Sequence, residues 1–246
     1  MKYYQDQIDM MALLGEIAPL ARTLANNDTD KALKIVADVL PDAVIKGFPS
    51  GSKAWTWTIP QRWEISSATI KANGETLVDA AWNPLHVINY SQPFKGVVTH
   101  AELLKHLCTH PERPQAIPFS FSFYEDIWGF SIPHEWLSRF TSDTYEVEIN
   151  SRFEEGNLNT LSLFIPGDSK ETFVICSNIC HPVQVNDSLT GVAVAVDIAK
   201  RLLARTSRKY SYLILVVPET IGSIAFLANH PEIIKASVGG FFSEML

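Results

Sequence analysis

The stretch TFVICSNICHPVQVNDSLTGVAVAVDIAKRLL, residues 172–203, decides the fold of this chain. Its apolar run, residues 173–179, is typical of a strand buried on both faces, because polar residues interrupt it only near its end. The run stops at His181-Pro182. Proline has no amide to donate and restricts the residue before it to extended geometry. We therefore expect His181 to end a buried strand and point into a loop.

A helix is predicted directly after this loop. Asn186-Asp187-Ser188 supplies a helix start, since short polar side chains accept hydrogen bonds from the free amides of a first turn. Apolar residues then recur at helical spacing as far as residue 204. Asp187 is thus expected at the mouth of this helix.

Strands and helices continue to alternate after residue 204. A strand over 210–217 ends at Pro218-Glu219, a helix covers 220–229, and a further strand covers 238–242. Such alternation predicts an α/β fold, in which the loops that leave the carboxyl ends of the strands share one sheet edge. If the two strands are neighbours or next-neighbours, their ends lie roughly 5 to 10 Å apart. His181, Asp187 and Glu219 are therefore expected to converge.

The earlier part of the chain has a different texture. Helical spacing marks residues 4–25 and a second helix before Pro41, and from residue 52 short strand patterns follow, among them a hairpin around Asn73-Gly74. Strands over 145–149 and 158–165 are predicted to pair with each other. The expected domains are amino-terminal helices over 1–51, a mainly β inserted domain over 52–145 and an α/β domain over 146–246.

The composition limits the classes of partner. With 20 basic and 27 acidic side chains among 246 residues, the net charge is −7, which argues against a nucleic-acid surface and leaves small molecules or peptides. No apolar run approaches membrane length, and the start MKYYQDQIDM is too polar for a signal peptide, so a cytoplasmic protein without membrane contact is expected. Three cysteines suit reduced thiols.

His181, Asp187 and Glu219 supply imidazole and carboxylate ligands, the set that Zn²⁺ accepts in catalytic sites. Each residue also has an ordinary structural interpretation. Asp187 is typical of a helix cap, His181 of a hydrogen-bonded loop histidine, and Glu219 of a first-turn acid that serves the helix dipole. Their convergence at one sheet edge favours a metal site.

Other candidate sites are weaker. A thiolate site at Cys176, Cys180 and His181 is disfavoured, because positions 180 and 181 would point to opposite faces if the strand continued that far. Both cysteines are interpreted as small buried hydrophobes. Ser188 and Ser223 lack the G-x-S-x-G setting of a serine hydrolase.

Five separated motifs resemble one family. CHPVQVNDSLTG, PETIGS, YEDIWGFSIPH, WTIPQRWEI and PLHVINYS together resemble the bacterial aminopeptidase-like proteins, zinc peptidases by analogy, with an inserted β domain of unknown function. They belong to the superfamily of zinc-dependent exopeptidases. The resemblance implies an α/β fold with a mixed or parallel sheet and flanking helices, interrupted by a small mainly β inserted domain.

The resemblance also assigns roles to residues. His181 matches the first metal-binding histidine, and Asp187 matches the aspartate that bridges two metals in active relatives. Glu219 matches the acidic position after the next strand, where classical members have two adjacent glutamates, a base and a ligand. Thr220 takes the second place here, so either role stays open for Glu219. One or two zinc ions are implied.

The family continues with a further acidic ligand and a late histidine, whereas this sequence ends at Ser243-Glu244-Met245-Leu246. We therefore expect the front part of such an enzyme, as a fragment, a truncated gene product or a degenerate member. Glu244 is an acid near the expected place, without a motif that identifies it as a ligand.

Two functions follow from these expectations. The first is a metal-dependent aminopeptidase-like hydrolase that cleaves an amide bond in a peptide or small amide, with Glu219 as the catalytic residue and His181 and Asp187 as metal ligands. The second is a non-catalytic binding or accessory protein that keeps the peptidase fold, in a family sometimes linked to polysaccharide biosynthesis. A homo-oligomer is compatible with either function.

Overall fold

A computed structural model describes residues 9–245 of the chain. These residues form two compact units, which we describe separately. The α/β unit comprises residues 9–62 and 155–245, and the β unit comprises residues 63–154. The β unit is thus inserted into the sequence of the α/β unit.

The α/β unit is built on a five-stranded sheet with the order β1-β10-β12-β11-β13. β11 runs parallel to β12 and to β13, whereas β10 runs antiparallel to β1 and β12. The sheet is therefore mixed, which is one of the two forms, mixed or parallel, that the family resemblance implies. The strand bounds are Val44–Pro49 for β1, Asn157–Ile165 for β10, Thr172–Asn178 for β11, Ser211–Val217 for β12 and Ser237–Phe242 for β13.

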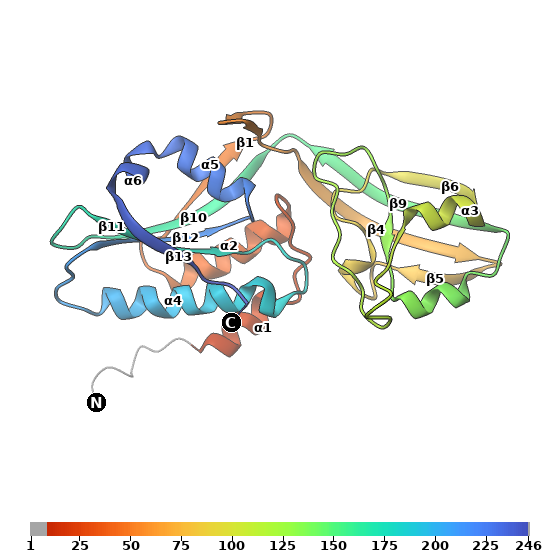
Figure 1. Cartoon of the computed structure of the whole chain (residues 1–246), viewed down its shortest axis with the longest axis horizontal. Helices are drawn as coiled ribbons and strands as arrows, with labels where there is room; N and C mark the ends of the chain where they lie inside the picture. Colours follow the sequence, from red (N-terminus) through yellow and green to blue (C-terminus); the bar gives the residue numbers. More distant parts are fainter. Residues whose placement is uncertain (1–8, 246) are drawn as a thin grey trace. The chain divides into compact units, whose positions relative to one another are not determined.

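Helices cover both faces of this sheet (Figure 1). α1 (Met10–Ile17), α2 (Asn27–Val39) and α4 (Thr190–Leu203) lie on one face, and α5 (Ile221–Asn229) and α6 (Pro231–Ala236) lie on the other. The main core fills the space between the first three helices and β10, β11 and β12, and it consists of aliphatic side chains that are almost fully buried. The predicted α/β fold with flanking helices is confirmed.

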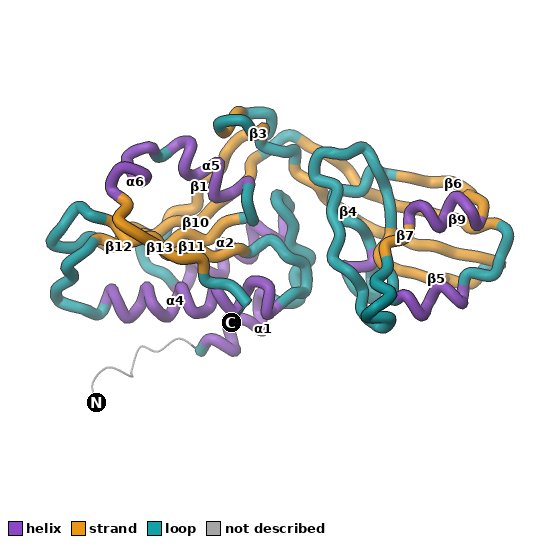
Figure 2. The backbone as a smooth tube through the Cα atoms, in the orientation of Figure 1, coloured by secondary structure: helices purple, strands orange, loops and turns teal. Residues whose placement is uncertain are grey.

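The β unit contains a four-stranded sheet with the order β5-β4-β9-β6. A long irregular stretch, residues 109–129, connects two short strands of this unit (Figure 2). The strands are β4 (Arg62–Ala72), β5 (Glu75–Asp79), β6 (Phe94–Thr99) and β9 (Thr144–Glu154), with the short pair β7 (Leu107–Cys108) and β8 (Phe130–Ser131). Helical turns are α3 (His100–Leu103) and the 3₁₀ segments Pro84–His86, Leu104–His106 and His134–Arg139.

Local signals predicted the strands better than their pairing. The hairpin around Asn73-Gly74 is confirmed, with Gly74 at the positive φ (80°) that such a turn requires. The predicted pairing of the strands at 145–149 and 158–165 is wrong, because β9 pairs with β6 while β10 pairs with β1 and β12. The two strands belong to different sheets.

The unit boundaries also differ from the sequence-based ones. The inserted unit spans 63–154 rather than 52–145. Residues 52–61 stay with the α/β unit because the small hairpin of β2 (Lys53–Ala54) and β3 (Trp57–Thr58) is hydrogen-bonded back to the end of β1. Residues 146–154 join the β unit because β9 continues without a break to Glu154.

Two predicted helices are shorter or shifted. The helix expected within 4–25 is observed over Met10–Ile17, and residues 4–8 lie outside the described residues. It ends just before Pro19, which has no amide to continue the helical hydrogen bonds, although Ala18 still has helical geometry. The helix expected over 188–204 begins only at Thr190.

Gly191 tests how tightly the end of the α/β unit is packed. A Cβ added at Gly191 would meet the carbonyl oxygen of Ser243 at 1.6 Å, whereas a Cβ at Gly15 of α1 would meet nothing within 4 Å. We expect Gly191→Ala to destabilise the protein by roughly 1–3 kcal/mol through overpacking. Gly15→Ala is the matched control and should stabilise by about 0.5–1 kcal/mol, because alanine loses less backbone entropy in a helix. Urea unfolding of both variants checks this, and equal stability changes would refute the close contact.

Candidate metal centre

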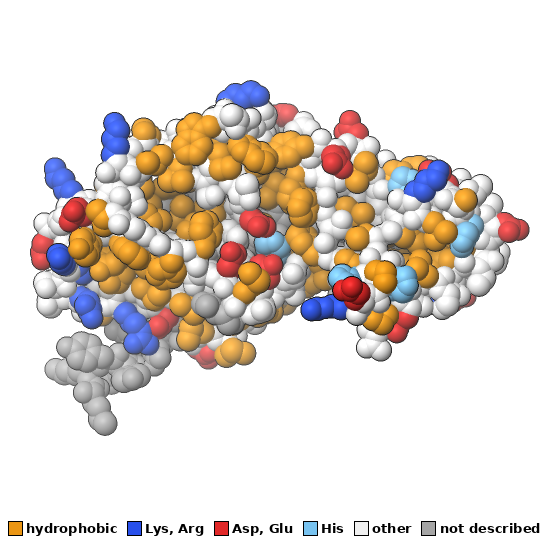
Figure 3. Space-filling view, viewed as in Figure 1, with side chains coloured by type: hydrophobic (Ala, Val, Ile, Leu, Met, Phe, Trp, Pro, Cys, Tyr) orange, Lys and Arg blue, Asp and Glu red, His pale blue; other side chains and the backbone are white. Residues whose placement is uncertain are grey.

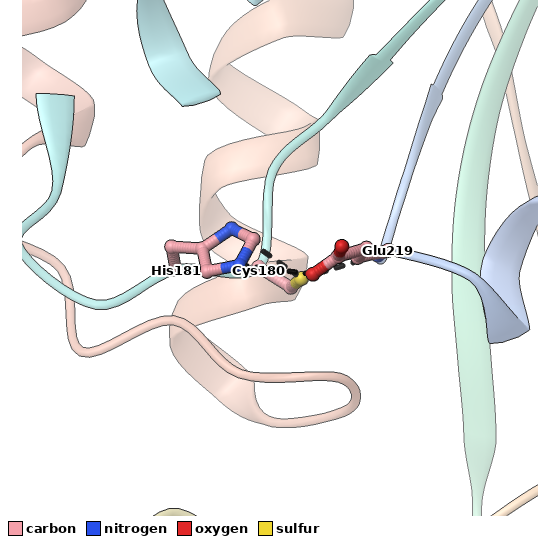
Figure 4. Close-up of side chains that lie close together, drawn as sticks. All are labelled: Cys180, His181 and Glu219. Atoms are coloured by element: carbon pink, nitrogen blue, oxygen red, sulfur yellow. Dashed lines mark hydrogen bonds and ion pairs between the residues drawn. The ribbon is translucent and has the colours of Figure 1, made fainter. Parts of the chain in front are cut away.

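The candidate site lies where β11 and β12 end. The two strands are parallel neighbours, with Asn178 opposite Val217, so the residues that follow them leave the sheet at the same edge. Beyond this edge the His181 ring reaches the Glu219 carboxylate, with 3.0 Å between Nε2 and Oε2 (Figure 4). The predicted meeting of these two side chains is therefore observed.

Asp187 approaches the same ring from its other nitrogen. Its Oδ1 lies 3.9 Å from His181 Nδ1. The histidine side chain is only 5% exposed, whereas the side chains of Asp187 and Glu219 are 40% and 50% exposed. The arrangement is a buried imidazole flanked by two acids that face solvent. A surface view shows acidic side chains beside a histidine on the α/β unit (Figure 3).

The structural interpretation of Asp187 as a helix cap does not hold. α4 begins at Thr190, its N-cap residue is Leu189, and no side chain caps it. Asp187 itself has extended geometry (φ −107°, ψ 96°) in an irregular turn, and its peptide bond to Ser188 is cis. The turn is fixed by Ser188, whose Oγ donates to the Asn178 carbonyl oxygen at 2.6 Å. The Asp187 carboxylate is thus not used to start the helix.

Glu219 is likewise not a first-turn acid. α5 begins at Ile221, after Thr220 at φ +56°, and its first turn contains no acid. The Glu219 amide donates to Cys180 Sγ at 3.1 Å, which ties the backbone of the two loops together. Its carboxylate is therefore directed to His181 rather than to the helix end.

Cys180 belongs to the site, although the sequence argument set it aside. That argument assumed strand alternation at positions 180 and 181, but β11 ends at Asn178 and the alternation ends with it. Cys180 Sγ lies 3.9 Å from His181 Nδ1. Burial raises the pKa of the Cys180 thiol to about 12, and burial does the same for Cys176.

The donor set fits a metal ion. One ligand atom each from Cys180, His181 and Glu219 can be chosen so that all three lie within 4.8 Å of one another. Tetrahedral zinc with bonds of 2.0–2.3 Å needs donor separations of roughly 3.3–3.8 Å, so small side-chain movements would suffice. Asn178 Oδ1, at the end of β11, is buried without a hydrogen-bond partner in the described part of the chain. An orphan acceptor of this kind is what an ion or a bound water satisfies.

The segment after β13 also reaches this edge. The Ser243 amide donates to the Cys176 carbonyl at 2.8 Å, and the Met245 amide donates to the Asn186 carbonyl at 3.0 Å. Asn178 Nδ2 donates to Glu244 Oε2 at 2.9 Å. Glu244 therefore lies at the end of β11, held by a neighbour of the site, and its position adds a further acid to this edge.

The comparisons with known proteins agree with this fold. The profile of the family described as a domain of unknown function (DUF4910) matches residues 11–246, and the chain belongs to this family. A protein of Clostridium acetobutylicum, named for polysaccharide biosynthesis and an aminopeptidase-like domain, is 36% identical over 224 residues. That match covers 91% of this chain and 51% of the relative. The aminopeptidase-like family expected from the motifs is confirmed.

Solved structures place the fold among the zinc aminopeptidases. A crystal structure from Clostridium acetobutylicum, named as a peptidase, is 34% identical with a TM-score of 0.89, covering 96% of this chain and 56% of that one. The zinc aminopeptidase of Bacillus subtilis is similar in fold only, at 12% identity and a TM-score of 0.61, covering 96% and 69%. The chain thus spans about half the length of its more similar relatives.

Within residues 9–245, no helix is both long enough and apolar enough to cross a bilayer.

The raised thiol pKa values give a prediction for the metal-free protein. Cys176 and Cys180, with pKa values of about 12, should stay protonated and unreactive at pH 8, because the thiolate is the reactive form. Cys108, which is only half-buried, serves as the internal control and should be labelled first by iodoacetamide. Mass spectrometry of the digested protein identifies the labelled residue. Labelling of Cys180 before Cys108 would show that this thiol is accessible.

Proposed function

We propose that this chain carries ligands of the metal centre of a zinc-dependent aminopeptidase-like hydrolase. The observation that carries the proposal is the meeting of His181, Asp187 and Glu219 at one sheet edge, with 3.0 Å between the His181 and Glu219 side chains. His181 and Asp187 would hold the ion, as the family resemblance implies, and Cys180 lies close enough to His181 to serve as a further donor. The family membership and the fold of the zinc aminopeptidases support this choice of metal.

The roles of the residues follow from their surroundings. A bound zinc ion lowers the pKa of its water toward neutral pH and polarises a carbonyl group. His181 is held rigidly by burial, so its ring nitrogen offers a fixed ligand. Glu219 is half exposed and can reach a water molecule at the mouth of the site, where its carboxylate would accept the proton as general base. The substrate would be a peptide or a small amide.

A second function is favoured by specific observations. Thr220 stands where an adjacent second acid would complete the set of classical members, and its positive φ (56°) bends the backbone there. The relative named for polysaccharide biosynthesis points to a role beside that process. A binding or accessory protein that keeps the peptidase fold without its chemistry accounts for these two facts.

The free thiols support a cytoplasmic location. Cys108, Cys176 and Cys180 form no disulfide. Reduced cysteines are usual where glutathione and thioredoxin keep thiols reduced.

His181→Ala should abolish stoichiometric zinc binding, since it removes the buried imidazole at the centre of the cluster. His230→Ala is the matched control, because His230 also pairs with a carboxylate, that of Glu232 at 2.9 Å, but at the surface of the same unit. Its zinc content should equal that of the wild type. Metal analysis after gel filtration measures both. Equal zinc content in the wild type and His181→Ala would refute the assignment.

Glu219→Gln distinguishes the two possible roles of Glu219, general base and metal ligand. If Glu219 is the base, turnover of an aminoacyl anilide should fall about 10²–10⁴-fold, while zinc content stays at the wild-type level. Anilide hydrolysis and metal analysis on the same samples provide the two measurements. Loss of zinc from Glu219→Gln would assign the carboxylate to the metal instead. Absence of any metal-dependent turnover in the wild type would favour the accessory function.

A further inference from the structure

A buried arginine connects α1 to the loop that carries His181. The side chain of Arg22 is completely buried, and the chain places it shortly after α1. All five of its acceptors are backbone carbonyl oxygens. They belong to Ile17 (2.5 Å), Leu20 (3.3 Å), Ile179 (2.8 Å), His181 and Gln184 (3.2 Å).

The guanidinium group donates its hydrogen bonds to backbone carbonyl groups in fixed directions and forms no ion pair with an acid among the described residues. Nη1 faces the end of α1, while Nε and Nη2 face the loop 179–184. Burial lowers the pKa of Arg22 to about 10, which reflects the free-energy cost of holding a charge inside the unit. Apolar residues of similar volume often replace buried charges without loss of stability. An apolar side chain, however, could not supply the five N–H donors that the planar guanidinium group holds in fixed directions.

The loop held by Arg22 is strained. Val183, between His181 and Gln184, has φ +49°, and a β-branched residue in the left-handed region is a genuine outlier. Such conformations persist only where the surrounding structure over-determines them. Arg22 restrains the backbone on both sides of Val183, because its Nη2 donates to the carbonyl oxygens of His181 and Gln184.

We propose that Arg22 is a positioning residue that holds the His181–Gln184 loop in the shape required for the His181 ring to face Asp187 and Glu219. Two measurements test this proposal. The first, hydrogen exchange of the loop (the loop arm), does not depend on the proposed function, whereas the second, zinc affinity (the metal arm), rests on it. Outer partners that orient a ligand typically contribute 10–100-fold to metal affinity. Arg22 acts one step further out, through the backbone of the ligand itself.

The loop arm uses hydrogen exchange on the metal-free protein. Arg22→Met should speed amide exchange of peptides covering 179–187, beyond the change expected from lower global stability. Leu33→Ala is the matched control, a fully buried core substitution on α2 that is compared at equal free energy of unfolding. In Leu33→Ala, the exchange of peptides covering 179–187 should change no more than that of the other peptides of the α/β unit. Equal local protection in the two variants would overturn the proposal.

Arg22→Lys distinguishes the effect of the positive charge from the effect of the planar array of N–H donors. Lysine keeps the charge but not the planar array of donors, so its loop exchange should resemble that of Arg22→Met. Wild-type protection in Arg22→Lys would overturn the claim that this array positions the loop. This variant also keeps the test decisive if Arg22→Met fails to fold.

The metal arm measures zinc affinity by competition with a chromophoric chelator. Arg22→Met and Arg22→Lys should bind zinc about 10–100-fold more weakly than the wild type, and Leu33→Ala should bind it as the wild type does. Millimolar guanidinium chloride should restore part of the affinity of Arg22→Ala but leave Leu33→Ala unchanged. Unchanged affinity in all Arg22 variants would overturn the proposal. Absence of zinc binding in the wild type would refute the proposed function alone, and the loop exchange would still decide the role of Arg22.

Discussion

The parallel pairing of β11 and β12 is the constraint on which the candidate site depends. Asn178 lies opposite Val217 at the end of the ladder, and His181 and Glu219 follow within a few residues on each strand. A strand rises about 3.3 Å per residue, so a slip of one residue would move one side chain past the other by that distance. The 3.0 Å separation of His181 Nε2 and Glu219 Oε2 would then be lost. The aliphatic core beneath the sheet fixes this register, since a slip would also turn Ile175 and Ile214 out of it.

The groups at this sheet edge differ in their exposure to solvent. The His181 ring, the Cys180 thiol and the Asn178 side chain are buried, whereas Asp187 and Glu219 stay open to solvent. Backbone contacts hold the pieces together: the Glu219 amide binds Cys180 Sγ, and Arg22 binds the carbonyl groups of the His181 loop. The buried groups are thus inside the unit, and the two acids that could exchange protons face solvent.

Most of the site was accessible from the sequence because its elements are local and continuous. Mainly apolar runs at 173–179 and 210–217 predicted buried parallel strands, and the polar residues directly after them predicted the site. The details that failed depend on distant or irregular backbone. β10 pairs with β1 and β12 rather than with β9, which no turn signal between the two could reveal. α4 starts later than predicted because Asp187 and Ser188 adopt non-helical geometry.

Two residues near the site were not assigned to it from the sequence. Cys180 was misjudged because strand alternation was extended as far as His181, beyond the real end of β11 at Asn178. Arg22 was invisible because its partners are carbonyl groups, which every residue has, so no complementary acid marks it. Glu244, by contrast, was noticed as an acid, and the structure adds its contact with Asn178.

Anomalous X-ray diffraction at the zinc edge, from crystals of zinc-loaded protein, would test the metal centre most directly. The zinc is expected about 2.0–2.1 Å from a ring nitrogen of His181, with a carboxylate oxygen of Asp187 or Glu219 also bound. A zinc ion bound only at a surface histidine such as His230, with none at His181, would contradict a metal centre at the end of β11 and β12.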